Sequence, residues 1–211
     1  MTDVAEPATV AEPVRPAMPT LAAGLGGGLV LGILARAWMR LIAEEPEFSW
    51  NGTLFIVIGF TIFGFTQSIV AVARRGARRR WKLTSVRVLG SVGMLPLFVG
   101  AGSLMFPTVV GAGLTFARVE WPRRVRRICL LVAAGPVLFV GKDLVGSFGW
   151  SPHTVVGFVA MLAIYSTIIR ATRFTFAAQS DGWRLKRWAR ISIFVLLGLA
   201  VAYITAGVVL Q

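Results

Sequence analysis

Charged residues that interrupt or directly follow long apolar stretches are the features of this sequence most able to do chemistry. They are Arg36, Arg40, Glu44, Lys142 and Asp143. In an apolar environment guanidinium and ammonium groups attract anions, while carboxylates hold such cations in ion pairs or accept protons. The pattern predicts either a site for a small anionic or zwitterionic solute or a structural ion-pair cluster. An Arg36–Asp143 pair and a Glu44–Lys142 pair both fit, and the sequence does not choose between them.

Two of these residues continue a four-residue repeat of glycines. Gly24, Gly28 and Gly32 are followed at the same spacing by Arg36 and Arg40. Residues four apart lie close together on one helix face, so we expect the glycines to let another helix pack closely and the arginines to point into the same bundle. The alternative is that the arginine side chains extend to the lipid headgroups, which is easier for Arg40 because it is nearer the end of the helix.

Several other chemistries lack the residues that they need. A single cysteine, Cys129, excludes an intrachain disulfide and a thiolate metal cluster, and a single histidine, His153, excludes the zinc patterns that need two histidines. The signatures of metalloproteases, serine hydrolases, P-loop proteins and dinucleotide-binding proteins are all missing. The sequence therefore predicts no metal site and leaves the cofactors unknown.

The amino-acid composition indicates that most of the chain lies in lipid rather than in water. The chain has 211 residues, of which 56% are hydrophobic and 15% charged, and its mean hydropathy is +0.75. A soluble domain carries roughly 45–50% apolar and about 25% charged residues. This composition excludes a soluble enzyme, a disulfide scaffold and a disordered chain. It predicts an all-α fold, a polytopic transmembrane helical bundle.

Apolar runs near the 20 residues needed to cross a bilayer define the expected elements. We predict seven spans, at about 20–43, 53–73, 84–101, 103–117, 128–148, 153–172 and 191–210. Residues 1–19, rich in Pro and Ala, are expected to form a flexible tail rather than a cleaved export signal, because acidic residues precede the first apolar run. Residues 20–211 then form one transmembrane helical domain.

The third and fourth predicted spans come from one long apolar tract, 84–117. A single helix of this length would measure about 50 Å, which is too long for one crossing, and basic runs flank both of its ends. A hairpin that turns near Gly100–Ser103 satisfies both facts. Two short spans are favoured, and a re-entrant pair that stops before the far face is the alternative.

The distribution of positive charge predicts the orientation. The net charge is +13, and most of the 22 Lys and Arg lie in three connections that share one side of the predicted bundle. The positive-inside rule places these connections, and the N-terminus, in the cytoplasm, with the C-terminus outside the cell (inner) membrane. Basic residues interleaved with tryptophan are expected to contact anionic lipid headgroups rather than nucleic acid. These are Arg78, Arg79, Arg80, Trp81, Lys82, Arg123, Arg124, Trp183, Lys186, Arg187 and Trp188.

Three functions remain open from the sequence. The first is a small transporter or channel-like permease, with an outward-facing charged vestibule lined by the spans at 20–43, 53–73 and 128–148. The second is a non-catalytic accessory or scaffold subunit, which would act as a homo-oligomer or with a membrane partner. The third is an intramembrane enzyme acting on a lipid or isoprenoid, with Glu44 or Asp143 as base; it ranks last because the acid-rich metal motif typical of diphosphate chemistry is absent.

Overall fold

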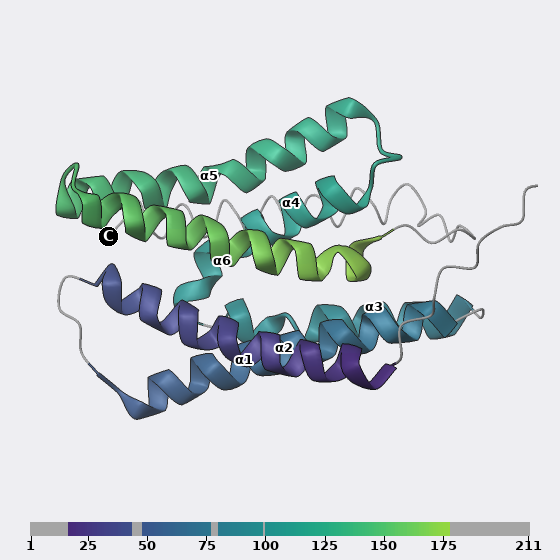
Figure 1. Ribbon diagram of the computed structural model, residues 1–211. Helices are drawn as coiled ribbons and strands as arrows, with labels where there is room; N and C mark the ends of the chain where they lie inside the picture. Colours follow the sequence, from purple (N-terminus) through teal and green to yellow (C-terminus); the bar gives the residue numbers. More distant parts are fainter. Residues whose placement is uncertain (1–16, 44–47, 77–79, 99, 178–211) are drawn as a thin grey trace, which may run out of the picture.

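The computed structural model describes residues 17–43, 48–76, 80–98 and 100–177. These residues form six α-helices and two short 3-10 helices, and the described part of the chain contains no strand (Figure 1). In chain order the elements are α1 (Ala17–Leu41), α2 (Trp50–Gly76), α3 (Arg80–Val92), η1 (Leu95–Phe98), η2 (Gly100–Met105), α4 (Phe106–Ala117), α5 (Arg123–Phe148) and α6 (Pro152–Phe176). The all-α prediction is confirmed for these residues.

Four helices have the length and composition of membrane spans. They are α1, α2 over Trp50–Arg74, α5 and α6. At 1.5 Å per residue, 25 residues measure about 37 Å, which exceeds the roughly 30 Å hydrocarbon core of a bilayer. Large apolar side chains such as Ile33, Leu131 and Val156 are exposed on their surfaces, as lipid-facing side chains would be. These helices indicate a membrane protein.

The four long helices coincide with the predicted spans at 20–43, 53–73, 128–148 and 153–172 to within five residues at each end. The predicted span at 191–210 and most of the predicted tail lie outside the described residues. The count of seven spans and the orientation of the termini therefore stay predictions.

The remaining apolar tract forms two shorter helical arms. α3 has 13 residues and α4 has 12, so each is about half as long as the spanning helices. In Figure 1 both arms extend from the end of the molecule at which α2 stops, and η1 and η2 join them near its middle. Met94, Leu97 and Met105, at this junction, are buried in the core. The glycine-rich segment Gly100–Ser103 lies in η2, between the two arms.

Glycines determine the packing of the first two helices. A Cβ placed on Gly28 would lie 2.5 Å from the Phe60 carbonyl oxygen, and one on Gly32 would lie 2.9 Å from the Cα of Val57. A Cβ on Gly24 would overlap the side chain of Ser68. The glycine face of α1 therefore rests directly on the backbone of α2, which is the close approach that small residues permit between membrane helices.

The second half of the fold is built around α4, which packs on α5 and α6. The Thr108 hydroxyl donates a hydrogen bond of 2.8 Å to the Ala133 carbonyl, and a Cβ on Gly111 would lie 2.6 Å from the Cys129 carbonyl oxygen. Cys129 is consequently buried against α4. Pro136 lies inside α5, which extends over Arg123–Phe148 as one helix.

Local signals explain the connection between α5 and α6. Gly149 follows the last turn of α5 with φ of +65°, a left-handed conformation that glycine adopts without steric cost. Ser151 then accepts a hydrogen bond of 3.2 Å from the Thr154 backbone N–H, and Pro152 occupies the first helical position of α6. This is the N-cap arrangement that stabilises a helix start.

Candidate functional site

A cavity of about 610 Å³ lies between α1, η2, α5 and α6. Arg36 from α1, Asp143 from α5 and Tyr165 from α6 line it, together with apolar side chains of which Leu104 and Met105 come from η2. The sequence predicted a vestibule between α1, α2 and α5, whereas α6 and η2 take the place of α2 in this lining. The glycine face of α1 rests on α2, so the two helices approach each other closely along that face.

Arg36 is partly buried and is oriented by α2. Its Nε donates a hydrogen bond of 3.0 Å to the Thr53 hydroxyl, and that hydroxyl donates 2.8 Å to the Ser49 carbonyl. Within the described residues no carboxylate pairs with Arg36. A neutral hydroxyl thus fixes the direction of the guanidinium group and leaves its positive charge available to the cavity.

Asp143 lines the same cavity from the opposite wall and is exposed. The structure brings Arg36 and Asp143 to one cavity but joins them by no ion pair. Lys142, the neighbouring residue, is also exposed and lines a second groove of about 550 Å³ between α5 and α6, beside Trp150 and Phe158. Adjacent residues of a helix point about 100° apart, so Lys142 and Asp143 lie on different surfaces of α5.

Of the other two residues of the predicted cluster, the structure describes only Arg40, which does not line the cavity. Arg40 is exposed, and its guanidinium carbon lies 5.3 Å from the centre of the Phe48 ring, which makes an edge-to-face contact with Trp50. This cation–π contact keeps Arg40 at the connection between α1 and α2. Glu44 lies outside the described residues. The sequence grouped five charges because helical spacing gives the face of each residue but not which neighbour that face meets.

Sequence reasoning did not place Trp38 and Tyr165 at this site. The indole N–H of Trp38 donates a hydrogen bond of 2.7 Å to the Gly157 carbonyl and so ties α1 to α6. Its ring meets Tyr165 edge to face at 6.4 Å between centroids. Both rings line the cavity beside Arg36. Their sequence signal is weak because aromatic residues are common throughout this chain, 14 Phe and 7 Trp among them.

The residues predicted to contact lipid headgroups are described only in part. Arg123 and Arg124 are exposed on the first turn of α5. Arg80, Trp81 and Lys82 belong to the first turn of α3. The remaining members of that set, at 78–79 and 183–188, lie outside the described residues.

A buried polar link joins α2, α3 and α6 away from the cavity. The Gln67 amide donates a hydrogen bond of 3.0 Å to the Gly90 carbonyl and accepts one of 2.7 Å from the Thr175 hydroxyl. Gln67 and Thr175 are both almost completely buried. Such links between helices are the expected use of an amide side chain in a membrane bundle.

Comparison of the chain with protein-family models, with curated protein sequences and with solved structures finds no match. Among the described residues, no group of three or more His, Cys, Asp or Glu could hold a metal ion. The cavity itself is therefore the basis on which a function can be proposed.

Proposed function

We propose that this protein is a small permease or channel of the inner membrane that passes a small anionic or zwitterionic solute through the cavity between α1, η2, α5 and α6. The proposal includes the seven-span threading with a cytoplasmic N-terminus and an external C-terminus. One observation carries it: Arg36 of α1 stands in the wall of a 610 Å³ cavity with a neutral hydroxyl as its hydrogen-bond partner.

Energetics favour a solute over a purely structural role for this arginine. An arginine at the centre of a membrane helix costs about 2.5–3.5 kcal/mol on translocon-insertion scales, and such arginines pair with other ionisable groups or with backbone carbonyls; the cost is smaller for Arg36, which lies in the last third of α1. In the described residues Arg36 has no such pair. An anionic group entering the cavity would supply a charged partner for Arg36. Asp143, on the opposite wall, would meet a positive group of a zwitterion or compete for Arg36 when the solute leaves.

The hairpin formed by α3 and α4 supports a path for the solute through the rest of the membrane. Its tip supplies Leu104 and Met105 to the cavity wall, and residues 95–98 and 100–105 form 3-10 rather than α-helix. Irregular backbone at membrane depth is tolerated where it is buried in protein or lines a water-filled cavity. In the seven-span threading the two arms are short spans and the tip forms the floor of the cavity; a re-entrant pair that stops before the far face is the alternative.

The test is anion flux through purified protein in liposomes. Shrunken vesicles are diluted into isotonic potassium chloride or potassium glutamate with valinomycin, and re-swelling is followed by light scattering. Arg36→Gln should lower the protein-dependent rate for the permeant anion about tenfold or more, the equivalent of about 1.4 kcal/mol. Arg36→Lys should retain part of it.

The matched control is Arg40→Gln, which removes the same charge from the same helix outside the cavity and should leave the rate unchanged. Equal rates for Arg36→Gln and the unmodified protein would refute the proposal. So would the absence of flux together with co-purification of a membrane partner in stoichiometric amount, which would establish the accessory-subunit alternative.

A further inference from the structure

The end of α5 and the start of α6 border a groove of about 550 Å³ that is separate from the Arg36 cavity. Figure 1 shows the two helices side by side at the end where the chain connects them. A Cβ on Gly141 of α5 would lie 3.0 Å from the Phe158 ring of α6, and both residues line the groove, so this contact joins its two walls. We call this space, lined from residues 137–145, 150 and 154–159, the α5–α6 groove.

The walls of the α5–α6 groove are mostly apolar and open to the surroundings. Leu138, Val155 and Val159 line it, and each of these side chains is more than half exposed. Both helices are long and apolar enough to span a membrane, so the groove faces the hydrocarbon chains of lipids. From Val137 to Val145 its wall on α5 extends about 12 Å along the helix axis. An elongated apolar wall of this kind suits an acyl chain.

Lys142 is the one charged side chain among the described residues that line the α5–α6 groove. It is exposed, and within the described part of the chain it has no ion pair and no hydrogen bond from its side chain. It lies six residues, or about 9 Å of helix, before the end of α5. A lysine at this depth keeps its stem on apolar surface and extends its ammonium group toward the membrane surface. The groove therefore has an unpaired positive group near one end.

Trp150 lines the same end of the α5–α6 groove, from the connection between the two helices. It is 86% exposed, and its indole N–H has no hydrogen-bond partner among the residues that the structure describes. Tryptophan is enriched at membrane–water interfaces, where its ring contacts acyl chains and its N–H meets polar headgroups. An indole donor and an ammonium group thus stand at the end of the groove where a headgroup would lie.

The distribution of acidic residues favours a lipid over another helix as the occupant. Of the nine acidic residues in the chain, only Asp143 lies within a predicted span, and the predicted span at 191–210 has none. In a second copy of the chain, Asp143 would line the Arg36 cavity. A membrane helix in the groove would therefore leave Lys142 without a counter-charge, whereas a lipid phosphate would supply one.

We propose that the α5–α6 groove binds one anionic phospholipid, with an acyl chain along its apolar walls and the phosphate beside Lys142. An ammonium group donates charge-assisted hydrogen bonds to phosphate oxygens, and the net negative charge of the headgroup favours an anionic lipid over a zwitterionic one. The groove and the Arg36 cavity lie on different surfaces of α5, so this proposal does not rest on the proposed permease activity.

The test uses the full chain purified in a neutral detergent. Phosphatidylglycerol or phosphatidylcholine is added in steps, and native mass spectrometry counts the bound lipids and gives the dissociation constant of the first one. We expect the first phosphatidylglycerol to bind several-fold tighter than the first phosphatidylcholine. Lys142→Gln should weaken the binding of phosphatidylglycerol about fivefold, the contribution of one basic residue near a membrane surface, and Lys142→Arg should retain it.

Two matched controls separate the groove from general effects of charge and shape. Arg40→Gln removes an exposed cation from the same end of the protein, outside the groove, and should leave the dissociation constant unchanged. Val155→Trp places an indole in the groove and should weaken the binding of phosphatidylglycerol several-fold. Val156→Trp makes the same exchange at the adjacent exposed position, which does not line the groove, and should have no effect.

Four results would overturn the proposal. They are equal first dissociation constants for the two lipids, equal binding by Lys142→Gln and the unmodified protein, and equal effects of the two tryptophan substitutions. The fourth is a stable dimer that binds no lipid and that Val155→Trp dissociates, because the groove would then hold a second copy of the chain.

Discussion

The contact between α1 and α2 gives a prediction whose size follows from the structure. In Gly28→Ala the new Cβ would lie 2.5 Å from the Phe60 carbonyl oxygen and 3.0 Å from the Cα of Thr61. Both atoms belong to backbone and cannot rotate away. Since Cβ atoms essentially never approach other heavy atoms within 3.0 Å, the helices must separate by at least about 0.5 Å.

Separation of this size removes packing along the whole contact. A gap of 0.5–1 Å loses a quarter to a half of the dispersion attraction between facing atoms. Overpacked sites of this kind typically cost about 1–3 kcal/mol. For a chain of this length each kcal/mol lowers the melting temperature by roughly 2–4 °C. Thermal unfolding in detergent, followed by size-exclusion chromatography, measures the change.

The adjacent glycines provide the control for this prediction. A Cβ on Gly26 meets no atom within 4 Å, so Gly26→Ala should be neutral or slightly stabilising, since alanine is the better helix former. Equal melting temperatures for Gly28→Ala and Gly26→Ala would refute the argument that the backbone contact governs the stability of this helix pair.

Two further substitutions test the polar contacts. Gln67→Leu removes both hydrogen bonds of the link between α2, α3 and α6 and leaves the buried Thr175 hydroxyl without its acceptor. The substitution should therefore destabilise the protein by about 1–3 kcal/mol in the same unfolding assay. A change in stability of less than about 0.5 kcal/mol would show that the link does not contribute to stability. Thr53→Val keeps the side-chain shape but removes the hydroxyl that accepts the hydrogen bond from Arg36, so anion flux should fall several-fold. Thr53→Ser keeps a hydroxyl and should retain the flux. Identical flux rates for the two variants would mean that the hydroxyl does not orient Arg36.

The helical class and four of the elements could be predicted because they depend on local properties of the sequence. The apolar length of 153–172 identifies α6, and Ser151 with Pro152 marks its start, since an N-cap needs only neighbouring residues. The spacing of Gly28 and Gly32 similarly defines one face of α1, and the structure places that face on α2.

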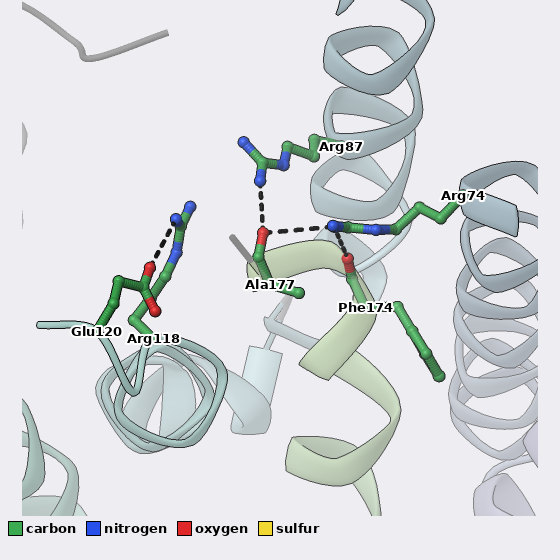
Figure 2. A network of polar contacts seen from close by, with 6 residues as sticks. All are labelled: Arg74, Arg87, Arg118, Glu120, Phe174 and Ala177. Atoms are coloured by element: carbon green, nitrogen blue, oxygen red, sulfur yellow. Dashed lines mark hydrogen bonds and ion pairs between the residues drawn. The ribbon is translucent and has the colours of Figure 1, made fainter. Parts of the chain in front are cut away.

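The arrangement of charges could not be predicted, because it depends on how each helix is rotated against residues distant in the sequence. Lys142 and Asp143 are adjacent in the chain, yet they line different cavities. In the sequence, Arg74 and Arg87 contributed only to the count of positive charges that predicts the orientation in the membrane. Their approach to the last turn of α6 (Figure 2), about 90–100 residues away, carries no signal in composition or spacing.

The burial of Cys129 against α4 has a practical consequence for work on this protein. Cys129 is 6% exposed, and cysteine occurs once in the chain. A maleimide reagent that cannot cross the membrane should therefore react slowly with the unmodified protein. Single cysteines introduced at exposed positions such as Trp150 or Arg124 can then be labelled against a low background, each reporting the side of the membrane on which it lies.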